Sequence, residues 1–466
     1  ESGRRAAGSH TAALATSDVA VDALFDQTGV IRAETLDELL AVGLGFATQS
    51  LPSGRRVGII TNAGGPAILC ADRCEASGLI VPELSAQTRK ALGAFLPTNA
   101  ARANPVDLIA SATPDQYADA ITVMLAADEI DALIILYVSV TVVDTAGIAE
   151  GISRGIEKAR TVGFKNKPVL ITWMAEGNQD RVFSVVGETI PVYALPETPA
   201  LVLSKLAAYA EWRQRPIDVV PDFDDLELSV ARTICDTALA QRGNGWLTTD
   251  ETRSVLNAIK VPLHLGEVVR TADEAVALAG KLGWPVALKL AAHQIVHKTE
   301  IGGVRLNLST EQSVRDAFAS IRSELSQRNQ LQTMEGVLVQ SMITDGVEVM
   351  VGVMHDPLFG PLIAFGLGGI HVEILKDVQF RITPLTEGDA AQMIREIKGY
   401  PLLDGYRGHR PADVKAVEDV LLRISRLVEE IPEIVELHLN PIFCLPPGRG
   451  CRIVDGRIRV SKSIAH

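Results

Sequence analysis

The sequence predicts an α/β protein with a doubly wound parallel sheet in its first half and a mixed α+β domain in its second half. Short, continuously apolar runs such as Val57–Thr61 and Ala132–Val140 alternate with helical segments, which is typical of strands covered on both faces. A stretch rich in proline and aspartate, Pro216–Asp225, then divides the chain. The second half opens with a capping box, Thr248 and Glu251, and continues with apolar runs separated by helices.

Each element of this fold is predicted from its own pattern. The segment Thr16–Gln49 is predicted to be helical, because its apolar residues recur at helical spacing. In both halves, apolar runs predict strands and the segments between them predict helices. The predicted strands are Val57–Thr61, Ala132–Val140, Pro168–Trp173 and Val192–Leu195, then Val286–Leu290, Gly336–Met342 and Val347–Val353; the predicted helices of the first half include Pro66–Ser77, Asp115–Ala127 and Thr198–Arg213.

Length, charge and cysteine content restrict the class of protein. At about 150 residues per domain, 466 residues indicate about three domains. The 44 basic and 57 acidic side chains give a net charge of −13, which argues against nucleic acid as a partner. No apolar stretch approaches the roughly 20 residues of a membrane span, so we expect no membrane contact and a cytoplasmic location. Five scattered cysteines indicate reduced thiols; Cys70 and Cys74 make a metal site conceivable, but buried thiols are the preferred interpretation.

The turn Thr61–Pro66, with the sequence TNAGGP, is the first candidate site. It follows a predicted strand and precedes a predicted helix, so Gly64 and Gly65 would expose backbone N–H groups at the positive end of the helix. That geometry suits a phosphate group. Glycine also serves tight strand-to-helix turns for steric reasons alone, so phosphate binding and plain turn geometry are equal alternatives at this point.

Lys289 lies within an otherwise apolar predicted strand and is the second candidate. A buried lysine is costly unless an anion neutralises it, and the Gly302–Gly303 pair shortly afterwards could fold over phosphates. A nucleoside triphosphate is the natural anion. The alternative is an edge strand from which Lys289 extends to water. A further glycine-rich tract, Gly366–Gly369, indicates that another backbone segment or a ligand approaches closely there. The tract alone does not identify the ligand.

Two oxygen-bearing side chains near the end of the chain, Asn440 and Asp455, are fifteen residues apart. That span fits two antiparallel strands presenting oxygen ligands to one Mg²⁺ ion that also holds nucleotide phosphates. A plain hairpin with its turn at Pro446–Gly450 predicts the same backbone, so the two interpretations coexist. At the other end, His10 taken alone is more typical of a solvent-exposed histidine near a terminus.

Together these segments resemble the NDP-forming acyl-CoA synthetases, the ADP-forming acetate:CoA ligases related to succinyl-CoA synthetase, and the resemblance covers essentially the whole chain. The segment Ser9–Ala15 matches the phosphohistidine motif of that family, with Ala12 in place of the usual glycine. The TNAGGP turn and Asn104–Asp107 match the ligase-CoA domain. The resemblance implies a flavodoxin-like doubly wound parallel sheet domain followed by an α+β ATP-grasp domain. It divides the chain into a C-terminal remnant of the phosphohistidine domain (1–50), the ligase-CoA domain (51–215), a linker (216–234) and the ATP-grasp domain (235–466).

The resemblance also implies roles for individual residues. His10 would carry a phosphoryl group, and His297 would be a second acceptor near ATP, unless His297 only hydrogen-bonds its own loop. The other implied residues form three groups. These are the phosphate-cradling loop (Asn62, Gly64, Gly65, Asn104, Asp107), the nucleotide-binding residues (Lys289, Lys298, Gly302, Gly303, Arg305, Gln340, Glu348) and the Mg²⁺ ligands (Asn440, Asp455).

The activity implied by the resemblance is the reversible reaction acyl-CoA + NDP + phosphate ⇌ carboxylic acid + CoA + NTP, through acyl phosphate and phosphohistidine. Its partners would be a carboxylic acid, CoA and ATP or ADP, with Mg²⁺ as the cofactor. Full-length relatives carry a CoA-binding domain and most of the phosphohistidine domain ahead of the point where this sequence starts. Either the sequence is a truncated gene or a fragment, or an oligomer or a second chain is expected to supply these parts. The alternative is a non-catalytic, nucleotide-sensing module or subunit of a larger acyl-CoA synthetase or protein acetyltransferase. One departure from the family is His438, where relatives usually carry an acidic residue.

Overall fold

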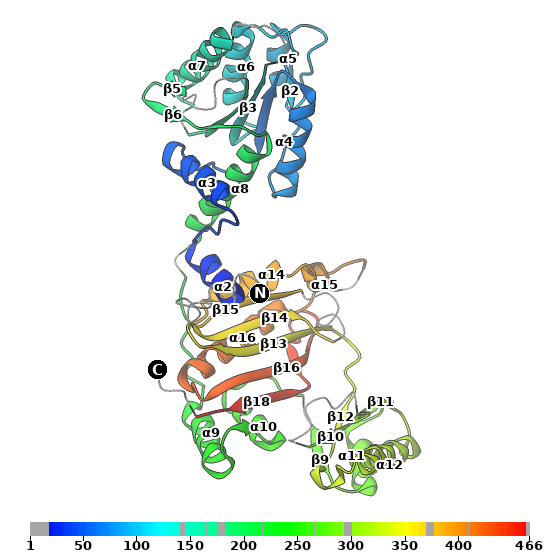
Figure 1. The fold of residues 1–466 in the computed structure, drawn as a ribbon. Helices are drawn as coiled ribbons and strands as arrows, with labels where there is room; N and C mark the ends of the chain where they lie inside the picture. Colours follow the sequence, from blue (N-terminus) through cyan, green and yellow to red (C-terminus); the bar gives the residue numbers. More distant parts are fainter. Residues whose placement is uncertain are drawn as a thin grey trace. The chain divides into compact units, whose positions relative to one another are not determined.

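The structure is a computed structural model that describes residues 18–139, 145–164, 166–175, 183–216, 218–264, 266–292, 301–369, 377–408 and 410–462. The chain folds into two compact units. One unit is Gly29–Pro216; the other consists of the chain after Pro216 together with the segment that ends at Thr28. The elements of each unit are labelled in Figure 1.

The unit Gly29–Pro216 contains a five-stranded sheet whose described pairings are all parallel. Alternate residues of each strand enter two separate cores: Ile134 joins the core beneath α3, α4 and α8, and Ile135 joins the core beneath α6 and α7. Helices therefore cover both faces, which confirms the predicted doubly wound arrangement. In sheet order the strands are β2 (Val106–Asp107), β1 (Val57–Thr61), β3 (Ala132–Val138), β4 (Val169–Met174) and β7 (Val192–Tyr193); the helices are α3 (Leu36–Thr48), α4 (Gly64–Ala76), α5 (Ala86–Gly93), α6 (Pro114–Ala126), α7 (Thr145–Val162) and α8 (Glu197–Arg213).

The second unit contains two antiparallel sheets, each with its own core. The larger sheet packs against helices α9, α10, α14, α15 and α16, and the smaller sheet packs against α11 and α12. This confirms the predicted α+β class. The larger sheet has the order β15 (Val378–Ile382), β14 (Gly360–Leu367), β13 (Val347–Asp356), β16 (Ile434–Cys444), β18 (Gly456–Val460) and β8 (Gly245–Trp246), with β17 (Cys451–Ile453) beside β16; the smaller has the order β11 (Val304–Leu308), β10 (Val286–Ala291), β12 (Gly336–Ser341) and β9 (Gly266–Val269).

Four helices of the second unit begin with a capping box at a threonine, namely Thr248, Thr271, Thr310 and Thr386. Thr248 and Glu251 form the predicted capping box: each side chain accepts a hydrogen bond from the other residue's backbone N–H. The helices are α2 (Asp18–Thr28), α9 (Leu228–Arg242), α10 (Thr249–Ala258), α11 (Ala272–Leu282), α12 (Glu311–Gln327), α14 (Glu387–Glu396), α15 (Tyr400–Asp404) and α16 (Val414–Glu430).

The boundaries between the units differ from the segments predicted for the chain. Helix α9 begins inside the predicted linker 216–234, and its Ala231 and Cys235 are fully buried in the core of the larger sheet. The predicted segment 1–50 is also divided, because α2 belongs to the second unit and α3 to the first. The side-chain amide of Gln27 explains the position of α2, since it exchanges two hydrogen bonds with the backbone of Ile382 on strand β15.

The five cysteines are free thiols and all are buried, as preferred from the sequence. Cys70 and Cys74 face the sheet from helix α4, within the core that α4 shares with α8. Burial raises the pKa of Cys235, Cys444 and Cys451 to about 12 in each case. Thiols of this kind are unreactive near neutral pH. None of the helices in the described part of the chain is both long and apolar enough to cross a membrane.

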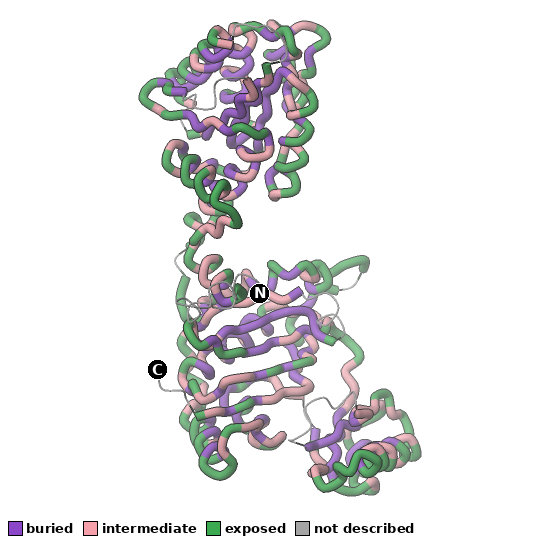
Figure 2. The backbone as a smooth tube through the Cα atoms, in the orientation of Figure 1, coloured by how far each residue is buried: buried purple, intermediate pink, exposed green. Residues whose placement is uncertain are grey.

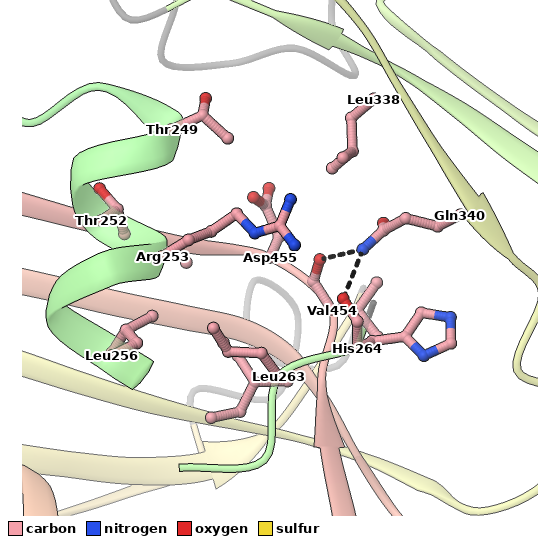
Figure 3. A pocket seen from close by; sticks show the side chains of 12 residues that line it. Thr249, Thr252, Arg253, Leu256, Leu263, His264, Leu338, Gln340, Val454 and Asp455 are labelled. Atoms are coloured by element: carbon pink, nitrogen blue, oxygen red, sulfur yellow. Dashed lines mark hydrogen bonds between the residues drawn. The ribbon is translucent and has the colours of Figure 1, made fainter. Parts of the chain in front are cut away.

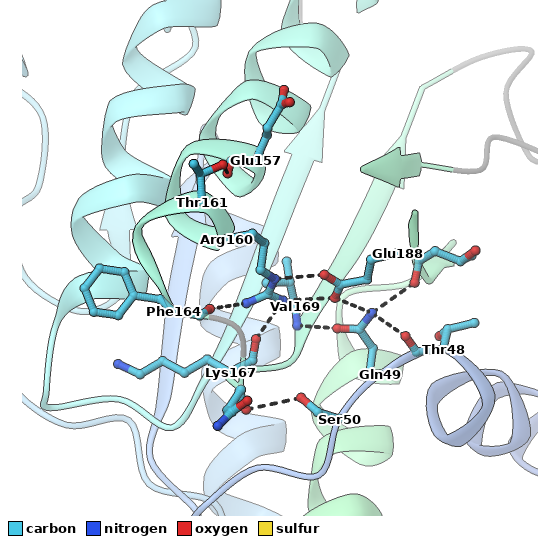
Figure 4. Close-up of polar contacts among 12 residues, drawn as sticks. Thr48, Gln49, Ser50, Glu157, Arg160, Thr161, Phe164, Lys167, Val169 and Glu188 are labelled. Carbon is cyan, nitrogen blue, oxygen red and sulfur yellow. Dashed lines mark hydrogen bonds and ion pairs between the residues drawn. The ribbon is translucent and has the colours of Figure 1, made fainter. Parts of the chain in front are cut away.

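A buried ion pair secures the segment after α3 to the parallel sheet (Figure 4). The guanidinium of Arg160 on helix α7 donates two hydrogen bonds to the carboxylate of Glu188, at 2.8 and 3.0 Å, and others to the backbone carbonyls of Phe164 and Lys167. The amide of Gln49 donates to Glu188 and accepts from the backbone N–H of Val169 on β4. The Arg160 side chain is only 5% exposed, so water does little to stabilise its positive charge. The Glu188 carboxylate compensates that charge.

We expect Glu188→Ala to lower the free energy of unfolding by about 3 kcal/mol, because it leaves the Arg160 charge buried without its partner. Asp115→Ala is the matched control, since it breaks the exposed Arg154–Asp115 pair of the same unit, whose side chains are 55% and 79% exposed. That change should cost less than about 1 kcal/mol. Urea denaturation of both variants measures the difference. Equal destabilisation by the two substitutions would contradict the importance given to the buried pair.

Candidate functional site

Lys289 lies on an interior strand of the smaller sheet, because β10 pairs with β11 on one side and with β12 on the other. The alternative of an edge strand is therefore wrong. Lys289 is 8% exposed and stands opposite Leu338 of β12 in the register. Directly opposite residues of antiparallel strands project from the same face of a sheet. Lys289 and Leu338 thus share one face.

That face borders a pocket formed with the larger sheet (Figure 3). Helix α10 contributes Thr249, Thr252 and Arg253, strand β12 contributes Leu338 and Gln340, and the segment 453–456 contributes Asp455. Figure 3 shows the Arg253 and Asp455 side chains directed into the same space. The space open to the centre of a water molecule is about 30 Å³, which is enough to hold water. The remaining lining residues are Leu256, Leu263, His264, Ile453, Val454 and Gly456.

Gln340 joins the two sheets at the edge of the pocket. Its amide nitrogen donates to the carbonyls of His264, at 3.2 Å, and Val454, at 3.4 Å. Its side-chain oxygen is buried and accepts no hydrogen bond from any residue that the structure describes. A buried acceptor without a donor is costly, and a ligand donor in the pocket would satisfy it.

The two implied Mg²⁺ ligands are Asn440 on β16 and Asp455 just before β18, and the implied nucleotide-binding residue Glu348 lies on the neighbouring strand β13. The backbone N–H of Asn440 donates to the carbonyl of Asp455 at 3.2 Å, which brings these two residues together as predicted from their spacing. The backbone N–H of Gly369 donates to the Asn440 side-chain oxygen at 3.4 Å, and a Cβ atom on Gly369 would lie 2.7 Å from a carboxylate oxygen of Glu348. Glycine at position 369, where φ is 63°, therefore leaves room for Glu348 beside Asn440.

This set of oxygens fits a hard cation such as Mg²⁺. Within the described ranges, no three or more His, Cys, Asp and Glu side chains gather into a metal-binding group. A magnesium ion here would therefore need the Asn440 amide and nucleotide phosphates in addition to the carboxylates of Glu348 and Asp455. Partial burial lowers the pKa of the nearby His438, and Glu436 counteracts this only in part, so His438 adds no positive charge at neutral pH.

We expect Asp455→Asn to raise the Mg²⁺ concentration needed for half-maximal nucleotide binding by about tenfold, because it removes one anionic ligand. Asp345→Asn is the control, since Asp345 pairs with Arg449 at an exposed position. Calorimetric titration of each variant with nucleotide at graded Mg²⁺ would measure the shift. An unchanged Mg²⁺ requirement in Asp455→Asn would remove Asp455 from the proposed ligands.

The glycine pair after β10 is held in place by Arg305. The Arg305 guanidinium donates to the carbonyl of Gly302 at 2.6 Å and to the hydroxyl of Ser320 on α12 at 2.9 Å. The carbonyl of Gly303 accepts from the N–H of Leu290, the residue after Lys289, at 2.7 Å. Arg305 therefore shapes the loop beside Lys289. His10, His297 and Lys298 lie outside the described residues.

The TNAGGP turn of the other unit lies at the carboxyl edge of its parallel sheet. Helix α4 begins at Gly64, and its N-cap residue Ala63 makes no side-chain hydrogen bond to the first N–H groups, which suit an anion. The Asn62 side chain exchanges two hydrogen bonds with the backbone of Val138, at 2.8 and 2.9 Å. A carboxylate oxygen of Asp107 lies 3.7 Å from the position that a Cβ atom on Gly64 would occupy.

Asn104 is placed differently from the other residues of the implied phosphate loop. Its side-chain oxygen accepts from the N–H of Ile59, and its nitrogen donates to the carbonyls of Val57 and Pro82, at 2.9 to 3.1 Å. These bonds attach the Asn104 side chain to strand β1 and the loop at Pro82. We therefore assign Asn104 to support of the sheet instead of contact with a phosphate.

Arg253 is a pocket residue that the sequence did not indicate. It lies one helical turn after Thr249 on α10, and its guanidinium donates to the carbonyl of Gly266 on β9 at 2.6 Å. Strand β9 belongs to the smaller sheet, whereas helix α10 packs against the larger sheet. A pattern of neighbouring residues in the sequence does not indicate a contact between two sheets.

Two antiparallel sheets that border a pocket, with a buried lysine on one and oxygen-bearing side chains on the other, are typical of a domain of the ATP-grasp class. The comparisons agree: residues 238–460 match the ATP-grasp domain, 57–216 the Ligase-CoA domain and 1–45 the Succinyl-CoA ligase like flavodoxin domain. The chain belongs to the family of ADP-forming acyl-CoA ligases.

Relatives of this chain occur both as single polypeptides and as separate subunits. The 4-hydroxybutyrate–CoA ligase (ADP-forming) of Nitrosopumilus maritimus is 33% identical over 98% of this chain and 64% of its own length. The β subunit of acetate–CoA ligase (ADP-forming) II of Pyrococcus furiosus is 42% identical over 49% of this chain and 97% of its own length. The α subunit of the same enzyme is 40% identical over 45% of this chain and 44% of its own length. The chain thus spans about two thirds of the length of the single-polypeptide relative.

Proposed function

We propose that this chain binds a magnesium nucleotide and transfers phosphoryl groups within an ADP-forming acyl-CoA ligase, which interconverts acyl-CoA, ADP and phosphate with a carboxylic acid, CoA and ATP. The observation that carries this proposal is the pocket between the two sheets of the second unit, bordered by the face of Lys289 and lined by Asp455. Family membership supports the reaction. CoA and the carboxylic acid would be the other substrates.

The charges of this pocket suit transfer of a phosphoryl group. Lys289 would neutralise phosphate oxygens from the smaller sheet, and the buried oxygen of Gln340 would accept a hydrogen bond from the nucleotide. Glu348, Asn440 and Asp455 would hold Mg²⁺. When bound, the ion would neutralise the negative charge that develops on the phosphate during transfer.

Two further groups would carry the phosphoryl group to the acyl-CoA chemistry. A neutral imidazole is nucleophilic near pH 7, and the nitrogen–phosphorus bond is labile enough to pass the group onward. By its motif, His10 is the carrier. The backbone N–H groups at the start of α4, with Gly64 and Gly65, would stabilise the phosphate where the acyl-CoA reaction takes place.

An assay of ATP formation from acyl-CoA, ADP and phosphate tests this proposal. We expect the chain to bind nucleotide by itself, and to form ATP at about 1 s⁻¹ or faster only together with a CoA-binding part of the family. The chain would be combined with the N. maritimus sequence that it does not match, and the acyl group would be varied. Nucleotide binding without ATP formation from any acyl-CoA would instead favour a nucleotide-sensing module. Absence of nucleotide binding would contradict both functions.

A further inference from the structure

The larger sheet of the second unit has an apolar face and a polar face, and its strands alternate between buried and accessible residues (Figure 2). Leu437 of β16 and Ile458 of β18 are fully buried in the core that the sheet shares with its helices. Successive side chains of a strand point to opposite faces of a sheet. The polar face therefore carries the residues that alternate with them, which are His438 and Asn440 of β16 and Arg457 and Arg459 of β18.

Arg457 lies beside the residues that are proposed to hold Mg²⁺. It stands directly opposite His438 in the register, and it comes two residues after Asp455, whose carbonyl accepts a hydrogen bond from the N–H of Asn440 at 3.2 Å. Arg457 is thus diagonal to Asn440 on the neighbouring strand. Diagonal positions are about 7–8 Å apart, and a long side chain spans that distance. The guanidinium of Arg457 can therefore reach a group bound at Asn440.

The positive charge of Arg457 has no partner among the residues that the structure describes. Arg457 makes no ion pair or hydrogen bond with any of them, whereas Arg459, two residues further along the same face, pairs with Glu436 at 3.6 Å. The aromatic rings of His438 and Trp246, on the strands at either side of β18, have their centroids 5.9 Å apart, and neither side chain is acidic. An unpaired guanidinium is thus located next to a candidate cation site.

A guanidinium beside a cation site is unfavourable unless an anion lies between the two. Two positive charges repel each other, and a negative group shared by the two locations removes that repulsion. A phosphate suits this position, because the planar fork of arginine donates two parallel hydrogen bonds to phosphate oxygens. The pocket lining along this segment ends at Gly456, so Arg457 is the next residue beyond it. A phosphate between Arg457 and the metal ligands therefore lies at the outer end of the pocket, as a terminal phosphoryl group must if it is to leave the nucleotide.

We propose that Arg457 binds the phosphoryl group that the nucleotide transfers, and that it is a further catalytic residue of this site. The inference rests on the proposed function. In the transfer, the bond between the γ-phosphorus and its bridging oxygen breaks, and a bond from phosphorus to a nitrogen of the neutral histidine forms. ADP leaves with the electron pair, and the N–H proton of the imidazole passes to water. Arg457 neutralises part of the negative charge on the three outer oxygens of the group while it moves.

Calorimetric titration with two magnesium nucleotides measures this contact. One is ADP and the other is the non-hydrolysable ATP analogue β,γ-methylene-ATP, which alone carries a terminal third phosphate. We expect Arg457→Met to weaken binding of the analogue by about tenfold or more and binding of ADP by less than about twofold. Arg459→Met is the matched control, because it removes the same charge from the same face of the same strand, and neither affinity should change by more than about twofold. Arg457→Lys restores the charge without the planar fork and should recover part of the affinity for the analogue.

The rate of label transfer from γ-labelled ATP to histidine shows at which stage the group meets Arg457. We expect Arg457→Met to slow the transfer by at least about 100-fold. Slower transfer with a weakened analogue means that the contact exists while the group is still on the nucleotide; slower transfer with both affinities unchanged means that it forms only as the group leaves. Equal losses of affinity for ADP and the analogue, or unchanged affinities with undiminished transfer, would overturn the proposal. Failure of the unmodified chain to bind either nucleotide would instead contradict the proposed function itself.

Discussion

Replacement of Lys289 by methionine is expected to weaken the binding of magnesium ATP by about 100-fold, because a charge-assisted contact with phosphate is lost. Lys289 lies on an interior strand and is 8% exposed, on the face that borders the pocket. Methionine keeps most of the volume of the lysine stem, so the packing of β10 between its neighbours should be preserved. Calorimetric titration would measure the affinity.

Lys281→Met is the matched control for this prediction. Lys281 is exposed on helix α11, which covers the same sheet, so its replacement removes an equal charge from the same part of the molecule. We expect its nucleotide affinity to change by less than about twofold, because exposed charges are screened by solvent. If Lys289→Met bound ATP as well as Lys281→Met does, Lys289 would have no role in the nucleotide site.

Incubation of the chain with γ-labelled ATP is expected to give an acid-labile, base-stable label, and His10→Ala should abolish transfer to the carrier position. Phosphohistidine has this stability because its nitrogen–phosphorus bond is cleaved readily in acid. His355→Ala is the control, since His355 is an exposed histidine of strand β13. Mass spectrometry of the labelled chain would locate the phosphoryl group.

His297 gives the same experiment a second outcome. Label that remains on His297 in the His10→Ala variant would mean that the chain completes only the first transfer from ATP. Label that disappears with His10 alone would restrict His297 to a hydrogen bond within its loop. Full labelling of both His10→Ala and His297→Ala would exclude a relay through these histidines.

The sequence predicts this fold well where a pattern is local. Strand β1 has the predicted bounds, and the capping box at Thr248 starts α10 as expected. The start of the second unit was harder to predict, because proline and aspartate mark the chain after Pro216 but do not reveal that Ala231 packs into the core of that unit. Position 27 illustrates the same limit: the contact of Gln27 with Ile382 joins residues 355 positions apart.

In the candidate site too, the sequence predicts some features and leaves others undetermined. The spacing of Asn440 and Asp455 predicted their proximity correctly, since a hairpin converts sequence distance into spatial distance. The burial of Lys289 was left open by the sequence, because an interior strand and an edge strand can have the same apolar pattern. Arg253 could not be found, since its partner, the carbonyl of Gly266, is a backbone group that every residue possesses. Only the arrangement of the two sheets brings that carbonyl within reach.

The contacts of Arg253 and Gln340 also make the two sheets of the second unit mechanically dependent on each other. Both side chains connect the sheets at one corner, beside the backbone bond between His264 and Ile453. These hydrogen bonds lie beside the pocket, so they fix the distance between the two sheets at that point. Any motion that changes this distance has to lengthen or break them, and its free-energy cost lowers the affinity of a ligand that requires the motion. Substitutions that weaken these bonds can therefore change the affinity through the spacing of the sheets.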